Sequence, residues 1–478
     1  MIRVYTALSD IRIMSIISPP MHLKDHSDTI VALSTPPGVG AIAVIRLSGA
    51  RSVEIADSIF KGKKLSEAAT HTVHFGTIYN EAGKLDEVVV AIFRNPTSYT
   101  GEDIIEISCH GSPYIQQQII ALLLSKGARM AEPGEFTLRA FLNGKMDLSQ
   151  AEAVADLIAA ETQASHVVAL KQMRGGYSTA LQDLRYELIH FASLIELELD
   201  FSEEDVEFAE RDHLLALIEK IQSVLTGLIR SFEFGNVIKN GVQTVIAGRP
   251  NAGKSTLLNA LLNEERAIVS NIPGTTRDTI EEELNINGII FRLTDTAGIR
   301  EAQDEIEKIG VDRTFEKIRT SALLIYLFDV NTMTAEAVQQ DLASFSSRSE
   351  KFLLVANKID TPEGGKRIAG FFEIEPDLFI SSLEKTNIDA LKQMMYKKVM
   401  TEDFHAENII VTNARHLEAL KKTQSTLNEV IAGINDHLSG DLSALQIRYA
   451  LNALGEITGQ ITNDDLLDNI FRKFCIGK

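Results

Sequence analysis

A segment near the middle of the chain restricts the fold more than any other feature. An apolar run at 243–247 leads into Gly248-Arg249-Pro250-Asn251-Ala252-Gly253-Lys254-Ser255, and a helical pattern follows at 256–262. This order predicts a strand, a phosphate-binding loop and a helix. The loop glycines let backbone N–H groups surround a β-phosphate, Lys254 can bridge β- and γ-phosphates, and the Ser255 hydroxyl can bind Mg²⁺. These residues therefore predict a nucleotide site.

Two segments downstream supply further contacts to Mg²⁺ and the γ-phosphate. Asp295-Thr296-Ala297-Gly298 follows a predicted strand, so Asp295 can hold the Mg²⁺ shell through water and the Gly298 amide can sense the γ-phosphate. Gly274-Thr275-Thr276-Arg277-Asp278 lies between the loop and this motif, where Thr276 is the natural second hydroxyl ligand of Mg²⁺. The alternative for that segment is a plain polar turn.

A third motif selects the base. Asn357-Lys358-Ile359-Asp360 follows a predicted strand at 352–356, and Asp360 can accept hydrogen bonds from both donors on the edge of guanine. Adenine presents an acceptor there, so the motif favours GTP over ATP. Asn357 is expected to contact N7, and Lys358 to pack along the base. Ser381-Ser382-Leu383 stands where GTPases usually carry Ser-Ala-Lys, and its Ser382 N–H is expected to reach the guanine carbonyl.

The usual means of positioning the attacking water are missing from the sequence. Ile299 stands where Ras-like enzymes carry a glutamine, and no arginine finger is identifiable in the chain. The acidic stretch 301–307 supplies candidate carboxylates for this task. Asn251 has a side-chain carbonyl near the predicted phosphates that can hold a monovalent cation in place of an arginine. The alternative is that Asn251 is a solvated loop residue.

The 478 residues suggest roughly three domains. Strand signals on both sides of Pro36-Pro37-Gly38 begin a compact α/β domain. Helical periodicity before and after the stranded region predicts a discontinuous helical bundle with an inserted Ras-like P-loop G domain that has a mostly parallel sheet. The fold class is thus multidomain, α/β plus all-α. The expected divisions are a disordered extension at 1–27, in which Met14 and Met21 are alternative starts to Met1, an N-terminal domain at 28–146, the helical domain at 147–238 and 401–478, and the G domain at 239–400.

Composition limits the partners and the compartment. The formal net charge is -19, so most of the surface would repel nucleic acid, and any RNA contact must be local. The two cysteines, Cys109 and Cys475, lie far apart, which argues against a disulfide framework and for the reducing cytoplasm. No run of about 20 apolar residues is present, so no membrane span is expected.

Taken together, the chain resembles the MnmE (TrmE) family of tRNA-modification GTPases, within the TrmE-Era-EngA-like P-loop GTPases, from Thr29 to Lys478. The resemblance implies a homodimer that works with the flavoprotein MnmG (GidA), in a heterotetramer or larger complex. Together they form 5-aminomethyl- or 5-carboxymethylaminomethyluridine at wobble position 34 of tRNA. It also implies 5,10-methylenetetrahydrofolate as the one-carbon source, or 5-formyltetrahydrofolate as ligand. The matching segments are Gly248 to Ser255, Gly274 to Asp278, Asp295 to Ala302, Thr35-Pro36-Pro37-Gly38, Pro133-Gly134-Glu135-Phe136 and Cys475-Ile476-Gly477-Lys478.

The resemblance also implies residue roles outside the G domain. Arg46, Glu106, Lys145 and Lys478 match the folate-binding positions, with Cys475 nearby as a candidate active thiol. A carboxylate such as Glu106 suits the amide edge of a pterin, and cationic side chains suit the glutamate tail of the folate. Read without the resemblance, Arg46 is a surface strand residue and the last four residues are a disordered tail. Prenylation of Cys475 fits poorly with the residues that follow it.

Within the G domain, the resemblance implies K⁺ bound by Asn251 with Ser270, Ile272 and Thr275, and Glu307 positioning the hydrolytic water. Lys254 and Thr276 complete the implied catalytic set, and Mg²⁺ is assigned to Ser255 and Thr276. The predicted GTP-binding residues are Asn251, Ala252, Gly253, Lys254, Ser255, Thr256, Ser270, Asn271, Ile272, Pro273, Gly274, Thr275, Thr276, Asp295, Thr296, Ala297, Gly298, Asn357, Lys358, Asp360, Ser381 and Ser382.

Two other function classes share these G-domain motifs. A potassium-stimulated ribosome-assembly GTPase would need an RNA-binding appendage rich in Lys or Arg, and the sequence shows none. A non-catalytic GTP-gated scaffold would not need Lys254, Ser255, Thr276 and Asp295 all intact. Multiple-turnover hydrolysis distinguishes the scaffold from an enzyme, and folate binding distinguishes the assembly factor from a tRNA-modifying protein.

Overall fold

The computed structural model describes residues 28–81, 83–200, 211–262, 282–295, 321–345, 351–400, 409–436, 440–462 and 464–477. The chain forms two compact units. The first contains the residues up to 152 together with those from 458 onward, and the second contains residues 153–457. Within the first unit, Phe471 of the last helix packs on Phe141, with ring centroids 6.5 Å apart.

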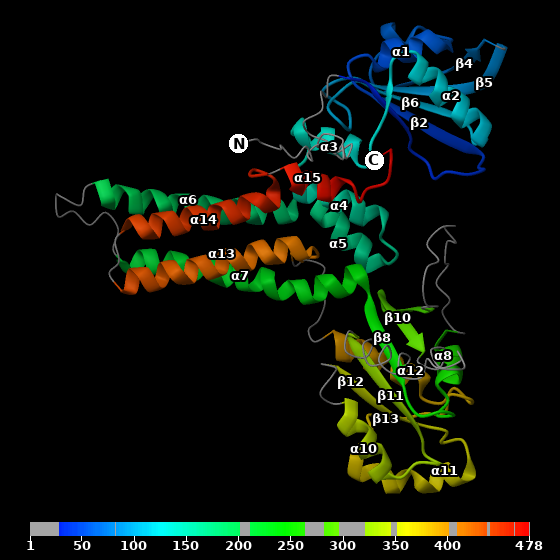
Figure 1. Cartoon of the computed structure of the whole chain (residues 1–478), viewed down its shortest axis with the longest axis vertical. Helices are drawn as coiled ribbons and strands as arrows, with labels where there is room; N and C mark the ends of the chain where they lie inside the picture. Colours follow the sequence, from blue (N-terminus) through cyan, green and yellow to red (C-terminus); the bar gives the residue numbers. More distant parts are fainter. Residues whose placement is uncertain are drawn as a thin grey trace, which may run out of the picture. The chain divides into compact units, whose positions relative to one another are not determined.

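The first unit is built on a seven-stranded sheet in the order β3-β4-β5-β6-β2-β1-β7, antiparallel except between β1 and β7. Helices α1 and α2 cover one face (Figure 1), and their apolar side chains share a core with alternate residues of the central strands. The elements are β1 (Ile30–Leu33), β2 (Ile42–Ser48), α1 (Ser52–Ile59), β3 (Phe60–Lys61), η2 (Leu65–Glu67), β4 (Thr72–Asn80), β5 (Gly83–Phe93), β6 (Ile104–His110), α2 (Pro113–Ser125), β7 (Arg129–Met130), α3 (Glu135–Leu142) and, from the end of the chain, α15 (Asp464–Phe471).

The opposite face of this sheet carries both polar and exposed apolar side chains. Directly paired residues point to the same side of a sheet. The register pairs Val73 with Ala91, Ala91 with Glu106, and Glu106 with Arg46, which places all four on this face. Phe75, two residues along β4 from Val73, is on it as well. Val73 and Phe75 are 64% and 68% exposed, so this face keeps an apolar surface in contact with solvent.

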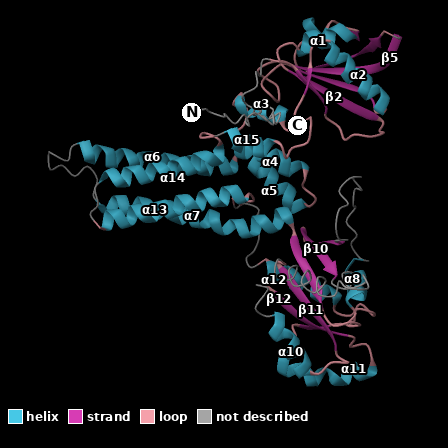
Figure 2. Ribbon diagram, viewed as in Figure 1, coloured by secondary structure: helices cyan, strands magenta, loops and turns pink. Residues whose placement is uncertain are grey.

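The second unit contains long helices that lie side by side (Figure 2). Apolar side chains from four of them share one continuous core. Asp147 caps the first helix of the helical segment, since its Oδ1 accepts from the Gln150 N–H and its own N–H donates to Gln150 Oε1, both at 2.9 Å. None of the described helices is both long and apolar enough to cross a bilayer. The helices are α4 (Leu148–Ile158), α5 (Gln163–Met173), α6 (Gly176–Asp200), α7 (Arg211–Asn240), α13 (Ala414–Asn435) and α14 (Gly440–Thr458).

A six-stranded sheet, in the order β13-β12-β11-β8-β10-β9, lies between α7 and α13 in the sequence. Its pairs are parallel except β9 with β10, which confirms the predicted mostly parallel sheet. Both faces are covered, as buried parallel strands require. The elements are β8 (Val242–Ala247), α8 (Lys254–Leu262), β9 (Glu282–Ile286), β10 (Ile289–Asp295), β11 (Leu323–Asp329), α10 (Ala335–Phe345), β12 (Phe352–Asn357), α11 (Pro362–Arg367), η4 (Ile368–Ile374), β13 (Leu378–Phe379) and α12 (Ile388–Val399).

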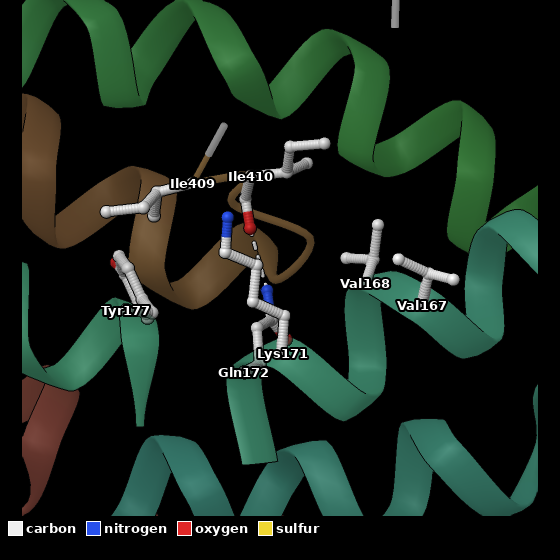
Figure 3. Close-up of a pocket in the computed structure, with 7 residues that line it drawn as sticks. All are labelled: Val167, Val168, Lys171, Gln172, Tyr177, Ile409 and Ile410. Carbon is white, nitrogen blue, oxygen red and sulfur yellow. Dashed lines mark hydrogen bonds between the residues drawn. The ribbon is translucent and has the colours of Figure 1, made fainter. Parts of the chain in front are cut away.

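The segment that returns from this sheet to the helices is fixed by side chains of α5 and α7. Gln172 Nε2 donates to the Ile410 carbonyl oxygen at 2.8 Å, a contact visible in Figure 3. The Val411 N–H donates to Ser231 Oγ at 3.0 Å. A Cβ on Gly235 would lie 2.0 Å from the Val411 carbonyl oxygen, so only glycine at this position of α7 allows the returning chain to lie so close. The returning connection is therefore held in place by α5 and α7.

Candidate functional sites

The loop between β8 and α8 has the strand, loop and helix order that the sequence predicts, and its shape requires glycine at two positions. A Cβ on Gly248 would lie 2.1 Å from the Leu327 carbonyl oxygen, and a Cβ on Gly253 would lie 2.4 Å from Asn357 Nδ2. At the tip between them, Asn251 adopts a left-handed conformation with φ of 63°, which asparagine tolerates better than most residues. The loop therefore passes tightly over the ends of β11 and β12.

Lys254 begins α8 with its ammonium group turned back onto the loop. The residue is 8% exposed, and Nζ donates to the carbonyl oxygens of Gly248 at 3.0 Å and Arg249 at 3.1 Å. A phosphate at the N-terminus of α8 would meet the positive end of the helix and compete with these carbonyls for Nζ. Ser255 and Thr256 follow on the exposed side of the first turn.

Asn357 connects the loop to the segment after β13. Its side chain is 1% exposed, and Nδ2 donates to the Ala252 carbonyl oxygen at 2.8 Å. Its Oδ1 accepts from both the N–H and the Oγ of Ser382, each at 3.0 Å. The Ser382 N–H, assigned from the sequence to the guanine carbonyl, thus already has an acceptor within the protein. Asn357 therefore positions two parts of the predicted base site, a role that the sequence did not indicate.

Asp360 is exposed, and its Oδ1 accepts a 2.6 Å hydrogen bond from Ser381 Oγ, which orients the carboxylate. Lys358 has a φ of 68°, and its Nζ lies 2.9 Å from Asp329 Oδ2 at the end of β11. Burial alone would raise the pKa of Asp329, but hydrogen bonds from Lys358 and Asn331 outweigh it and lower the pKa. Lys358 is thereby held by a stable anion while its aliphatic chain remains available to a base.

Several predicted residues lie outside the part of the chain that the structure describes. Asp295 is described as the last residue of β10, paired in register with Ile246, but its side chain is outside the description. The extension 1–27, including Met1, Met14 and Met21, lies outside as well. The other predicted positions outside the described residues are Ser270, Asn271, Ile272, Pro273, Gly274, Thr275, Thr276, Thr296, Ala297, Gly298, Ile299, the stretch 301–307 with Glu307, and Lys478.

In the first unit, Arg46 on β2 and Glu106 on β6 form a partly buried ion pair. Nε and Nη2 of Arg46 lie 2.8 and 2.7 Å from Glu106 Oε1, and the two side chains are 18% and 26% exposed. The Arg46 guanidinium also lies 5.7 Å from the ring centroids of Tyr99 and Phe136. Arg46 is thus partly buried between a carboxylate and two aromatic rings and is not a plain surface residue.

The end of the chain lies against this pair. Arg46 Nη1 donates to the Gly477 carbonyl oxygen at 3.4 Å, and Ser34 Oγ donates to the same oxygen at 3.3 Å. Ile476 forms an antiparallel bridge with Pro133, and Cys475 beside it is exposed. The alternative of a disordered tail is wrong for residues 475–477. These contacts bring the described part of the terminal tetrapeptide to the predicted folate residues.

Lys145 lies on the surface of the same unit, where its Nζ donates to the Pro96 carbonyl oxygen at 2.9 Å. The loop between β5 and β6, which contains Pro96, also carries Tyr99, one of the rings beside Arg46. Tyr99 and Phe136 were absent from the sequence-predicted site. Phe136 belongs to the segment Pro133-Gly134-Glu135-Phe136, so only its role was missed. Nothing local in the sequence marks Tyr99.

A mostly parallel sheet with a glycine-dependent loop before α8 and an Asn-Lys-x-Asp motif after β12 defines a P-loop protein of the Ras-like GTPase class. Comparison with known proteins is more specific. Two family models match, the "GTP-binding protein TrmE N-terminus" at residues 29–145 and the "MnmE helical domain" at residues 148–475. The chain belongs to the MnmE family.

Relatives match along nearly their whole length. The "tRNA modification GTPase MnmE" of Cytophaga hutchinsonii is 56% identical over 456 residues, covering 95% of this chain and 99% of the relative. The protein of the same name from Christiangramia forsetii is 53% identical over 471 residues, covering 95% and 99%. Among solved structures, Era of Aquifex aeolicus matches with 26% identity and a TM-score of 0.27, covering 39% of this chain and 66% of that one.

Proposed function

We propose that this protein hydrolyses GTP and acts in modification of the wobble uridine of tRNA. The relatives that match over 95% of the chain carry the name tRNA modification GTPase. The proposed GTP contacts are Lys254 and the α8 amides for the phosphates, and Asn357, Lys358 and Asp360 for guanine. Hydrolysis would drive a conformational cycle, since none of these residues suits carbon chemistry.

We propose that the first unit binds a tetrahydrofolate beside Arg46, and this is the claim that separates the assignment from other GTPases. The observation that carries it is the convergence of Arg46, Glu106, two aromatic rings and the terminal tail on one sheet face. Both Arg46 contacts to Glu106 end on Oε1. The second carboxylate oxygen suits the amide edge of a pterin, and Lys145 and Lys478 would attract the glutamate tail.

We propose Mg²⁺ and K⁺ as the ions of the G domain. Ser255 is on the first turn of α8, where its hydroxyl can join Thr276 in binding Mg²⁺ beside the β-phosphate. Asn251 is at the exposed tip of the loop with a left-handed backbone, which suits a side-chain carbonyl that helps to bind K⁺ with Ser270, Ile272 and Thr275. Glu307 is the proposed water-positioning residue.

We propose a homodimer, which works in the cytoplasm with the flavoprotein MnmG and with tRNA. The exposed apolar face of the first unit supports self-association, because Val73 and Phe75 are mostly exposed on it and Ile42 is 67% exposed. The same face contains Arg46 and Glu106, so association there would enclose the folate site. The net charge of -19 restricts tRNA contact to a local surface. The product would be 5-aminomethyl- or 5-carboxymethylaminomethyluridine.

Calorimetry with 5-formyltetrahydrofolate tests the folate proposal. We expect saturable binding by the parent protein and its loss in Arg46→Ala, because that change removes the charged partner of Glu106 and one anchor of the tail. Arg51→Ala is the matched control, since Arg51 is an exposed arginine whose partner is Glu54 on α1. A folded, GTP-hydrolysing protein that does not bind the folate would favour a ribosome-assembly GTPase. Absence of multiple-turnover hydrolysis would favour a GTP-gated scaffold.

A further inference from the structure

The phosphate loop is attached on its outer side to a helix that belongs to no nucleotide-binding motif. Arg249 follows the first glycine of the loop, and its Nε and Nη2 donate to Oδ2 and Oδ1 of Asp341 on α10 at 2.7 and 2.8 Å. Tyr326 on β11 donates its hydroxyl to the same carboxylate. We call Arg249, Asp341 and Tyr326 the outer clamp. Its members come from the loop, a strand and a helix.

The outer clamp holds the side chain of Arg249, and the carbonyl oxygen of the same residue accepts a hydrogen bond from Lys254. The Arg249 carbonyl oxygen accepts from Lys254 Nζ at 3.1 Å and from the Ala252 N–H at 3.2 Å. A phosphate that recruits Lys254 withdraws the first of these bonds. The bonds of the Arg249 side chain to Asp341 do not depend on Lys254, so they remain. The outer clamp can therefore hold the loop backbone after the hydrogen bond from Lys254 Nζ to the Arg249 carbonyl oxygen is lost.

The geometry of the clamp suits a fixed tether. A bidentate pair of arginine and carboxylate restrains orientation as well as distance. Asp341 is 21% exposed and Tyr326 is 1% exposed, so both acceptor and second donor are embedded in the fold, while Arg249 extends from the loop to meet them. The hydrogen bond from Arg249 keeps the pKa of Asp341 below its usual value of 3.8, although burial opposes this. The carboxylate is thus ionised at neutral pH.

We propose that Asp341 and Tyr326 are positioning residues for nucleotide binding, which act through Arg249 on the loop tip at 249–251. The proposal rests on GTP binding at this loop and extends it to residues that touch no part of the nucleotide. Guanine selection depends on Asn357 and Asp360, which the clamp does not contact, so selectivity over adenine stays unchanged when the clamp is broken.

The test measures GTP and GDP affinity and steady-state hydrolysis of the full-length protein. Asp341→Ala is expected to weaken binding of both nucleotides about fivefold and to raise KM for GTP equally, the scale of one partly exposed charge pair. The turnover number should change little, because the lost interaction is made equally in ground and transition states. Gln340→Ala, an exposed neighbour on α10, is the matched control and should behave like the parent.

Two further variants keep the proposal testable if Asp341→Ala does not fold. Arg249→Ala removes the same bonds from an exposed side chain and should reproduce the fivefold effect, and the double variant should be no worse than either single one. Tyr326→Phe should give a smaller change. Unchanged nucleotide affinity in a folded Asp341→Ala or Arg249→Ala protein, or additive effects in the double variant, would overturn the clamp. A parent that binds no GTP would instead overturn the proposed function.

Discussion

The phosphate loop and the Arg46 site show two ways in which one chain builds a candidate binding surface. The loop is contiguous, and the strand and helix on either side orient its eight residues. The Arg46 site is assembled from β2, β6, the loop between β5 and β6, α3 and the end of the chain, with Arg46 and Gly477 separated by 431 positions. The first kind of site leaves a pattern in the sequence. The second depends on the fold to exist at all.

The largest expected effect tests whether the two sites are separate. Lys254→Ala removes the ammonium group that we propose bridges the phosphates, so we expect hydrolysis to fall by about 100-fold or more. Folate affinity should equal that of the parent, because Lys254 contributes nothing to the first unit. Phosphate release under multiple turnover and calorimetry with 5-formyltetrahydrofolate measure the two activities.

Lys366→Ala, at an exposed lysine on α11, is the control for removing one positive charge from the G domain. If Lys254→Ala retains hydrolysis, the loop is not the catalytic site. If Lys254→Ala loses folate binding together with hydrolysis, the two sites are coupled and do not function separately.

The difference between a contiguous site and one assembled from distant segments explains what could be predicted from the sequence. The order of strand, loop and helix around Gly248–Ser255 and the mostly parallel sheet follow from local patterns, and both are observed. Helical periodicity near the end of the chain shows that a face must be buried but not which partner covers it, so the contact of Phe471 with Phe141 could not be predicted. Tyr99 and the engagement of the Ser382 N–H by Asn357 depend on tertiary contacts and left no local signal.

A smaller effect tests how far the Arg46 site depends on the chain terminus. Gly477 has a φ of 96°, and a Cβ there would lie 2.4 Å from the Leu33 carbonyl oxygen, which belongs to the backbone and cannot rotate away. Gly477→Ala should therefore displace the tail from Arg46 and Ser34. We expect folate affinity to fall about tenfold, equivalent to roughly 1.4 kcal/mol, while GTP hydrolysis stays at the parental rate.

Gly83→Ala separates steric displacement from backbone strain. Gly83 also has a positive φ, 123°, but a Cβ there would meet nothing within 4 Å. It should keep parental folate affinity. Equal loss of affinity in both variants, or no loss in Gly477→Ala, would show that the tail does not form part of the site.

The smallest expected effect concerns the framework behind the Arg46 site. Glu135 begins α3 and is 2% exposed, and its Oε1 lies 2.6 Å from Arg129 Nη2 and 3.0 Å from Arg139 Nη2. The Arg139 side chain is 1% exposed. Such a buried network needs every charge in place, because removing one partner leaves the others unpaired. The core of the G-domain sheet, in contrast, is apolar on both faces.

This difference predicts that acid loosens the first unit before the G domain. Burial would raise the pKa of Glu135, but the hydrogen bond from Arg129, the Glu132 amide and the two arginine charges lower it below its usual 4.5. A lowered folded-state pKa contributes stability that is present above 4.5 and is lost as pH falls through the folded-state value. Hydrogen exchange of α3 peptides should therefore accelerate below about pH 4 relative to peptides of β8 and β12, once intrinsic rates are corrected. Glu135→Gln should weaken protection of α3 at neutral pH and flatten its acid dependence, whereas Glu67→Gln, at an exposed pair, should change neither. An acid profile of α3 that is identical in parent and Glu135→Gln would mean that the charged network does not hold the framework of the Arg46 site.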